Sequence, residues 1–347
     1  MSYIVVFVIA FAIAWIITPL SATLGQRLKL IDTPGGRRTH HGEVPRSGGL
    51  ALFAGFMTVG LLILLSNALD FGPPINPEER KLLTGVLLGS SVAFLFGLWD
   101  DRRELSAWQQ FGGQFVVALI AIFFDIIIER ATLPIVGYIE KFPFFITYPL
   151  TIFWVMGMIN TVNWLDGLDG LAAGVGTIAS LLFAVHAYTL GQTTVALFPL
   201  ALAAACLGFL PFNFHPARIF MGSGGSIFLG YTLASLSIVA PAKLATALLV
   251  LGIPIIDVAW LVIQRWRLRG NPMLGGRDHL HHRLLDIGLS QRQIVALYYT
   301  FCATFGLLAL LIQDRLLKLL ALAVMGTLTL ALLWWLARRD GQSLDQA

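Results

Sequence analysis

Long apolar runs separated by short polar segments dominate this chain. Runs of about 17–25 mostly apolar residues are long enough to cross a bilayer as helices. Eleven such runs occur, at 3–20, 48–66, 83–99, 111–128, 147–162, 170–190, 194–212, 226–241, 244–264, 296–313 and 317–337. The pattern predicts an all-α integral membrane protein, a polytopic bundle of about 11 transmembrane helices that forms a single domain over residues 1–347.

Composition supports this fold class. Apolar residues make up 57% of the chain, charged residues 12%, and the mean hydropathy is +0.80. Soluble domains are usually about 25% charged. No basic residue precedes the run 3–20, which favours a retained transmembrane helix over a cleaved signal peptide. Cys206 and Cys302 lie in apolar runs, where we expect them to act as small buried hydrophobic side chains.

The positions of Lys and Arg predict the orientation in the membrane. If the segment 21–47 is cytoplasmic, sixteen of the 23 basic residues fall in cytoplasmic segments. Because basic residues concentrate on the cytoplasmic side, we expect the N-terminus outside and the C-terminus in the cytoplasm. The same rule explains the pI near 9.2 without a nucleic-acid partner.

Five polar segments fall on the predicted cytoplasmic face. They combine carboxylates, imidazoles, guanidinium groups and glycines, and they span 30–49, 97–106, 160–176, 211–226 and 275–288. Four of the five have structural explanations of their own: a solvated helix end at 100–101, helix caps at Asp166 and Asp169 with hydrogen bonds between helices from Asn160 and Asn163, surface histidines at 279–282, and a tight turn at 222–225. Their convergence on one face favours a functional site.

The residue types indicate phosphoryl-transfer chemistry. Four carboxylates held close together, those of Asp100, Asp101, Asp166 and Asp169, need a compensating cation, and oxygen ligands suit Mg²⁺ or Mn²⁺. Glycine turns and helix N-termini expose N–H groups that bind phosphate. An acidic metal site beside phosphate-binding groups at a membrane surface is typical of phosphoryl transfer.

The same segments carry a resemblance to a known family. The run Asp100-Asp101 with Leu105, the run NTVNWLDGLDGL, the run FMGSGGS and the run HLHH occur in this order. From about residue 30 to about 290 the chain resembles the polyprenyl-phosphate N-acetylhexosamine-1-phosphate transferases, the WecA/TagO/MraY group. HLHH resembles the WecA/TagO branch more than the MraY branch, in which three histidines are consecutive.

The resemblance implies a reaction and its partners. Members transfer N-acetylhexosamine-1-phosphate, most often GlcNAc-1-phosphate, from a UDP-sugar to undecaprenyl phosphate in the bacterial cytoplasmic (inner) membrane, with Mg²⁺ (or Mn²⁺) as cofactor. They release UMP, and the lipid-linked diphosphate sugar starts a surface polysaccharide such as lipopolysaccharide or teichoic acid. The resemblance also implies contact with membrane lipid and no nucleic-acid partner. It further implies a homodimer, an assembly seen among relatives.

The resemblance also assigns roles by position. Implied catalytic residues are Asp100, Asp101 and Asp169, and the resemblance gives Asp100 the role of base at the lipid phosphate. Implied metal-site positions are Asp166, Asp169 and Ser223, and implied nucleotide-binding residues are Asn163, Asp166, Gly167, Leu168, Asn213 and Phe220. Implied sugar-diphosphate contacts are Arg277, His279, His281 and His282, and implied lipid-phosphate contacts are Arg37, Arg38 and His40.

Ser223 departs from the family pattern FMGDxGS, whose aspartate is a metal ligand. A serine hydroxyl carries no charge and is a weaker ligand. Three explanations stay open: a disabling substitution, a natural member with a rearranged metal site, or a relative that only binds its ligands.

The mechanism implied by the resemblance has two possible routes, direct attack by the lipid phosphate or a covalent aspartyl intermediate. Direct attack is favoured because phosphate is already a nucleophile.

A transporter is the alternative from another class. Transporters place polar groups near the membrane midplane, often in broken helices and repeated halves. Here the acidic residues cluster at one face, and the sequence has no visible internal repeat. The sequence therefore favours an enzyme. Asp257, after Pro254, stays open as either a structural residue or part of the cavity.

Overall fold

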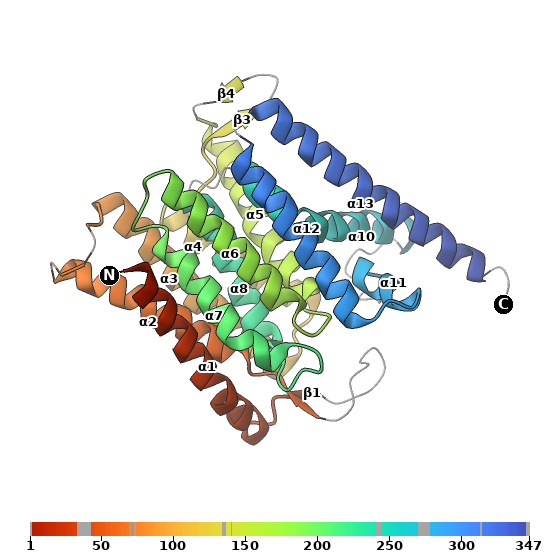
Figure 1. The fold of residues 1–347 in the computed structure, drawn as a ribbon, viewed down its shortest axis with the longest axis horizontal. Helices are drawn as coiled ribbons and strands as arrows, with labels where there is room; N and C mark the ends of the chain where they lie inside the picture. The colour runs from red at the N-terminus through yellow and green to blue at the C-terminus, as the bar shows by residue number, and fades with distance from the viewer. Residues whose placement is uncertain are drawn as a thin grey trace.

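The computed structural model describes residues 2–32, 43–69, 71–72, 74–133, 137–139, 141–239, 244–269, 278–312 and 314–344. Within this part the chain is a helical bundle with two small antiparallel hairpins (Figure 1). The helices are α1 Tyr3–Arg27, α2 Gly49–Ala68, α3 Pro77–Arg103, α4 Ala107–Phe123, α5 Phe144–Leu165, α6 Leu171–Thr189, α7 Leu197–Asn213, α8 Gly222–Val239, α9 Leu244–Val250, α10 Gly252–Arg269, α11 Leu280–Asp286, α12 Gln291–Leu311 and α13 Arg315–Leu344. The hairpins pair β1 Ile31–Asp32 with β2 Val44–Pro45 and β3 Ala131–Leu133 with β4 Gly137–Ile139.

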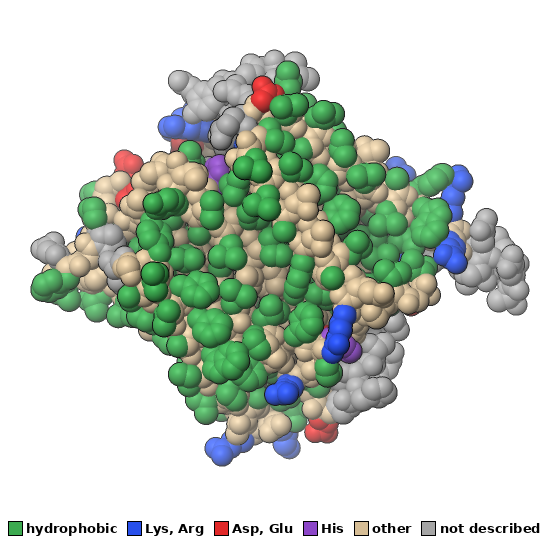
Figure 2. Space-filling view, viewed as in Figure 1, with side chains coloured by type: hydrophobic (Ala, Val, Ile, Leu, Met, Phe, Trp, Pro, Cys, Tyr) green, Lys and Arg blue, Asp and Glu red, His purple; other side chains and the backbone are tan. Residues whose placement is uncertain are grey.

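The predicted class of a multi-pass helical membrane protein is confirmed. By length and composition, eight helices in the described residues are apolar and long enough to cross a membrane: α1, α2, α3, α5, α6, α8, α12 and α13. Two further apolar helices, α4 and α7, have 17 residues each, the lower limit for a span. Figure 2 shows apolar side chains over most of the visible face, with many of the Lys and Arg side chains near its edges.

The ninth predicted span, 244–264, is not one helix. It is broken at Leu251 into α9 and α10, and α10 continues to Arg269. Pro254 lies in the first turn of α10, where a residue without an N–H is tolerated. Residues 244–264 thus form one apolar run in the sequence, but this run belongs to two helices in the structure. The count of eleven helices and the outside position of the N-terminus stay predictions.

α8 lies at the centre of the bundle and packs against α2, α3 and α5, among others. Small residues allow the closest of these approaches. A Cβ atom on Gly97 of α3 would lie 2.4 Å from the carbonyl oxygen of Ser223. One further contact joins the same two helices, a 2.8 Å hydrogen bond between the hydroxyl groups of Ser90 and Thr232. The end of α3 is thus held directly against the start of α8.

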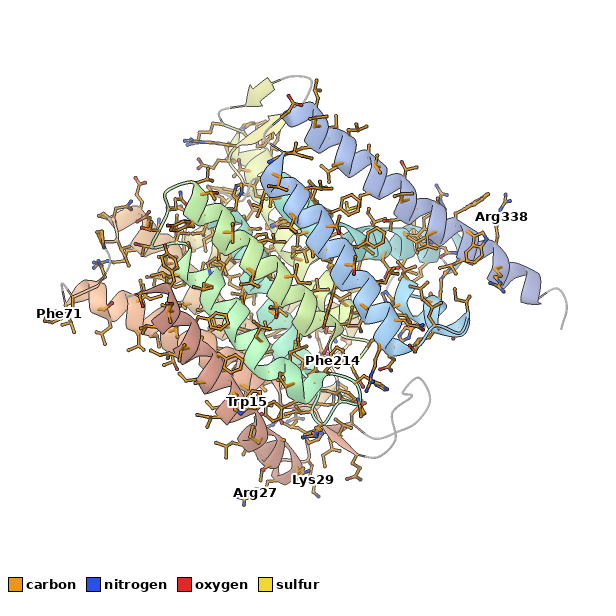
Figure 3. The ribbon with its side chains drawn as sticks, viewed as in Figure 1. Trp15, Arg27, Lys29, Phe71, Phe214 and Arg338 are labelled. Atoms are coloured by element: carbon orange, nitrogen blue, oxygen red, sulfur yellow. The ribbon has the colours of Figure 1, made fainter. Side chains whose placement is uncertain are left out.

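The chain reverses direction so that several element ends gather at one side of the bundle. Figure 3 places Arg27 and Lys29, at the end of α1, and Phe214, after α7, towards the end opposite Phe71. The hairpin β1–β2 lies at the same end, next to the start of α2 (Figure 1). The described parts of the polar segments predicted to share one face contact one another at this end.

Candidate active site

The two aspartates at the end of α3 have different surroundings. Both oxygens of Asp101 accept backbone hydrogen bonds from the start of α8, from Ser223 N and Gly224 N, at 2.9 Å each. Asp100 turns the other way, and its Oδ1 accepts from Leu105 N at 3.1 Å and from Gln110 Nε2 at 3.0 Å. The Asp101 carboxylate therefore caps α8, whereas Asp100 is held by the connection to α4.

Backbone pairing joins the first polar segment to the start of α8. Phe220 N donates to Pro45 O at 2.8 Å, and Gly48 N donates back to Phe220 O at 2.9 Å. Between these contacts the Arg46 guanidinium lies 3.6 Å from Asp101 and 3.7 Å from Asp32. Gly222 has a φ of +72°, and a Cβ there would lie 2.3 Å from the Arg46 carbonyl oxygen, so glycine is required.

A turn between α5 and α6 carries the second pair of acids. Asp169 Oδ2 lies 2.8 Å from His215 Nδ1 and accepts from Ala217 N at 3.1 Å. The turn is also fixed by Asn213, whose Oδ1 accepts from Gly170 N at 3.1 Å while its Nδ2 donates to Ile219 O at 3.0 Å. Among the described residues no hydrogen bond reaches the Asp166 carboxylate, so Asp166 is the acid left open.

The electrostatics show that these acids are neighbours. Burial raises the pKa of the Asp166 carboxyl group well above its ordinary value, and the charge of Asp101 raises this pKa further. Arg46 acts in the opposite direction and lowers it, and Asp169 adds a smaller increase. Acids from α3 and from the α5–α6 turn therefore share one electrostatic environment.

The amides of α5 bond to neighbouring helices. Asn160 exchanges two hydrogen bonds with Gln114 of α4, at 2.6 and 3.3 Å. Asn163 Oδ1 accepts from the hydroxyl of Ser226 in α8 at 2.8 Å. The structural explanation for these asparagines is thus correct as far as their present contacts go. Asn163 also lies one helical turn before Asp166, so it can bond to α8 and also support the site around Asp166.

The histidines of the HLHH run lie on or beside α11, against the α5–α6 turn. A Cβ on Gly167 would lie 2.5 Å from His281 Nε2. His281 is buried, and neither ring nitrogen has a hydrogen-bond partner in the described part of the chain. Burial lowers the pKa of His281 well below its ordinary value, and His282 and His279 lower it further. The rings stack, with centroids of His279 and His281 5.4 Å apart.

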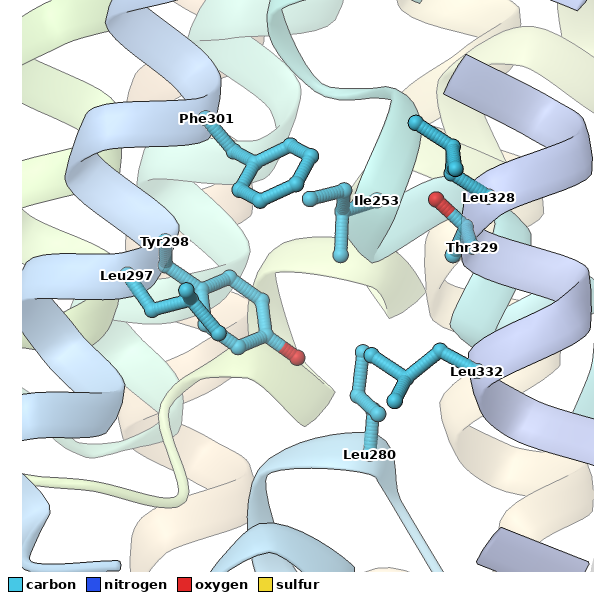
Figure 4. Close-up of a pocket in the computed structure, with 8 residues that line it drawn as sticks. All are labelled: Ile253, Leu280, Leu297, Tyr298, Phe301, Leu328, Thr329 and Leu332. Carbon is cyan, nitrogen blue, oxygen red and sulfur yellow. The ribbon is translucent and has the colours of Figure 1, made fainter. Parts of the chain in front are cut away.

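An apolar cavity lies behind α11, between α10, α12 and α13 (Figure 4). Its lining is Ile253, Leu280, Leu297, Tyr298, Phe301, Leu328, Thr329 and Leu332. The hydroxyl of Tyr298 points towards this space and has no hydrogen-bond partner among the described residues. The cavity lacks acidic and basic residues, so it does not belong to the phosphate chemistry.

The donor set fits Mg²⁺ in the way this ion is usually held. Mg²⁺ binds through one or two carboxylates, waters and substrate phosphate oxygens more often than through a complete protein cage. In the part of the chain that the structure describes, no group of three or more His, Cys, Asp or Glu side chains could hold a metal by itself. The Asp166 carboxylate accepts no hydrogen bond from the described residues. The negative charges of Asp101 and Asp169 raise its pKa, and a bound cation would relieve this repulsion.

The remaining predicted residues divide into two sets. Leu168 is buried beneath the α5–α6 turn, and Phe220 and Ser223 are half-buried at the start of α8. Arg37, Arg38, His40 and Arg277 lie outside the described residues. Sequence reasoning missed Arg46 and His215 as partners of Asp101 and Asp169. Both lie in polar segments already singled out, so the signal was their charge within those segments.

Comparison with known proteins decides the family. Residues 83–241, from α3 to just beyond α8, match a family model described as glycosyl transferase family 4. A Bacillus subtilis (strain 168) protein named "Probable undecaprenyl-phosphate N-acetylglucosaminyl 1-phosphate transferase" is 33% identical over 318 residues, covering 90% of this chain and 85% of the relative. The chain belongs to glycosyl transferase family 4. The resemblance to the WecA/TagO/MraY group is therefore confirmed.

Other family members have related names. A decaprenyl-phosphate N-acetylglucosaminephosphotransferase of Mycobacterium tuberculosis (strain ATCC 25618 / H37Rv) is 34% identical over 309 residues, or 80% of this chain and 74% of the relative. A phospho-N-acetylmuramoyl-pentapeptide-transferase of Halalkalibacterium halodurans is 30% identical over 324 residues, or 88% and 96%. The family thus includes relatives named for two kinds of sugar phosphate.

Proposed function

We propose that this protein transfers N-acetylhexosamine-1-phosphate, with GlcNAc-1-phosphate as the leading candidate, from a UDP-sugar to undecaprenyl phosphate in the bacterial cytoplasmic membrane. The observation that carries this proposal, in a family member, is the shared electrostatic environment of Asp101, Asp166 and Asp169, with Asp101 bound to the glycine-rich start of α8. GlcNAc is favoured because the Bacillus and Mycobacterium relatives bear that sugar in their names.

In the proposed reaction an oxygen of the lipid phosphate attacks the β-phosphorus of the UDP-sugar. The bond from this phosphorus to the oxygen bridging it to the α-phosphate breaks, and UMP leaves with that oxygen. The products are UMP and a lipid-linked diphosphate sugar. Because both Asp101 oxygens already accept backbone hydrogen bonds, Asp101 is a poor nucleophile. Direct attack is favoured because the lipid phosphate is already a nucleophile and needs positioning more than covalent help.

The residues then take distinct roles. Asp100 orients or deprotonates the lipid phosphate, and Asp101 keeps the start of α8 in place beside it. Asp166 and Asp169 would hold Mg²⁺, which when bound supplies positive charge to the diphosphate. Asn213 and Phe220 line the nucleotide side, and the α11 histidines lie on the sugar-diphosphate side. Arg37, Arg38, His40 and Arg277 are proposed as further phosphate contacts.

Ser223 sets the expected level of activity. Its backbone N–H is used by Asp101, and its hydroxyl supplies no charge where the family pattern has a carboxylate. Loss of one transition-state charge contact typically lowers turnover about 10²- to 10³-fold. We therefore expect a slow transferase whose Mg²⁺ affinity is low, rather than an inert protein.

Product analysis tests the proposal. Purified protein in detergent is incubated with undecaprenyl phosphate, Mg²⁺ and either UDP-GlcNAc or UDP-N-acetylmuramoyl-pentapeptide, and the lipids are identified by mass spectrometry. A lipid diphosphate carrying GlcNAc, formed in equal amount to UMP, supports the proposal. A muramoyl product corrects the sugar. Binding of the UDP-sugar without any product, including in Ser223→Asp, would mean a binding protein instead.

A further inference from the structure

Asp257 is a buried acid that the proposed chemistry does not use. It lies in α10, is 4% exposed, and occupies an apolar helix face. An acid at such a position is costly unless its oxygens are satisfied. Both are: Oδ1 accepts from Leu280 N at 2.9 Å, and Oδ2 lies 3.2 Å from His279 Nδ1. The whole carboxylate is therefore directed at the start of α11.

His279 is fixed on three sides. Nδ1 contacts Asp257, one face stacks on His281, and the indole of Trp164 packs against it at 5.2 Å between ring centroids. A carboxylate can only accept, so Nδ1 must carry the proton, as in other Asp–His pairs. No described residue hydrogen-bonds His279 Nε2. In the neutral ring Nε2 then presents its lone pair to whatever binds there.

The same contact places α11 against the α5–α6 turn. His281, two residues after His279, meets Gly167 beside Asp166. Leu280 and Leu284 are buried behind α11 and hold it by packing as well. Asp257 thus sets the orientation of the first turn of α11, while apolar contacts supply much of its attachment.

We propose that Asp257 is a positioning residue that fixes the proton of His279 on Nδ1 and aligns α11 with the Asp166–Asp169 turn. The catalytic consequence rests on the proposed function, but the tautomer does not. The acid itself is required. In Asp257→Asn the single amide oxygen is needed by Leu280 N–H, so the NH₂ group faces His279 Nδ1. That contact requires an unprotonated Nδ1 and moves the proton to Nε2.

Nitrogen NMR of the full chain, labelled with ¹⁵N-histidine, tests the tautomer. Spectra are recorded in detergent at a pH of about 8.5, where an unperturbed histidine is neutral. His279→Gln assigns the His279 signals. We expect a protonated Nδ1 in the parent chain and an unprotonated Nδ1 in Asp257→Asn. The matched control is Asp314→Asn, because Asp314 also caps a helix, through Leu317 N at 2.9 Å, but contacts no histidine in the described residues.

Turnover provides the second readout. UMP release by Asp257→Asn should fall about 10- to 100-fold, by analogy with the loss of a carboxylate that orients a metal-ligating histidine. We expect the loss in kcat more than in KM, with melting close to that of the parent, while Asp314→Asn keeps the parent rate. If the parent chain is too slow, both variants are made in the Ser223→Asp background.

The two hypotheses fail in different ways. An unprotonated Nδ1 in the parent chain overturns the positioning proposal even if Asp257→Asn does not fold. So does Asp257→Asn with parental turnover. Absence of UMP from every chain, with the expected NMR signals, overturns the proposed function and leaves the assigned tautomer standing.

Discussion

Replacing Asp101 with asparagine tests the contact that joins α3 to α8. The carboxylate accepts two backbone N–H groups at 2.9 Å each, and asparagine can accept only one. The lost bond to a charged acceptor is worth about 1.5–3 kcal/mol. Arg46 is partly exposed and keeps Asp32 as a partner, so loss of its ion pair with the buried Asp101 carboxylate adds about 1 kcal/mol. Relief of repulsion with Asp166 offsets part of the loss.

We therefore expect Asp101→Asn to lower the free energy of unfolding by about 2–3 kcal/mol. The assay is thermal and denaturant unfolding of the detergent-solubilised protein, followed by tryptophan fluorescence. The matched control is Asp125→Asn, because Asp125 is exposed, pairs with Lys81, and has a φ of +59° that asparagine tolerates. That change should cost less than about 1 kcal/mol. Equal stability losses in the two variants would refute the capping role of Asp101.

Two further predictions concern the α5–α6 turn. Because the pKa of Asp166 is raised, its ionisation destabilises the folded state as the pH rises above the ordinary carboxyl pKa. In metal-free buffer at neutral pH, Asp166→Asn should therefore melt at a higher temperature than the parent, and this gain should vanish near pH 3. An unchanged melting temperature at neutral pH would argue against burial of this acid. Gly167→Ala should lower UMP release at least about 10-fold, because the added methyl group pushes His281 away. The control Gly157→Ala, in α5, should keep the parent rate, because the space around its Cβ is open. Equal activity of the two variants would show that α11 is free to move.

The sequence predicted the fold class well because transmembrane length and apolarity are local properties. The fifth run, short at 147–162, was identified and belongs to a longer helix, Phe144–Leu165. The interruption at Leu251 was missed, since Leu251 is apolar and Gly252 lowers the hydropathy of the run 244–264 only slightly. Apolar composition reports burial in lipid or protein and does not report whether the backbone is continuous.

The site was predictable as a set of segments but not as a set of contacts. Its acids were found because charge is rare in this chain, and the structure brings Asp101 and Asp166 into one environment. The partners of these acids depend on tertiary packing. Nothing in the sequence indicated that Asp101 would cap α8 or that His215 would lie 2.8 Å from Asp169. Asp257 could be noticed as a charge within α10, but its contact with His279 required the fold.

The most direct test of the central claim is UMP release by the purified chain with UDP-GlcNAc, undecaprenyl phosphate and Mg²⁺, run beside Ser223→Asp. We predict slow release by the parent chain and release about 10²- to 10³-fold faster by Ser223→Asp, with a lower Mg²⁺ requirement. Equal rates would show that the site works fully with serine. No UMP from either protein, with properly folded samples and several UDP-sugars, would contradict the assignment as a sugar-phosphate transferase.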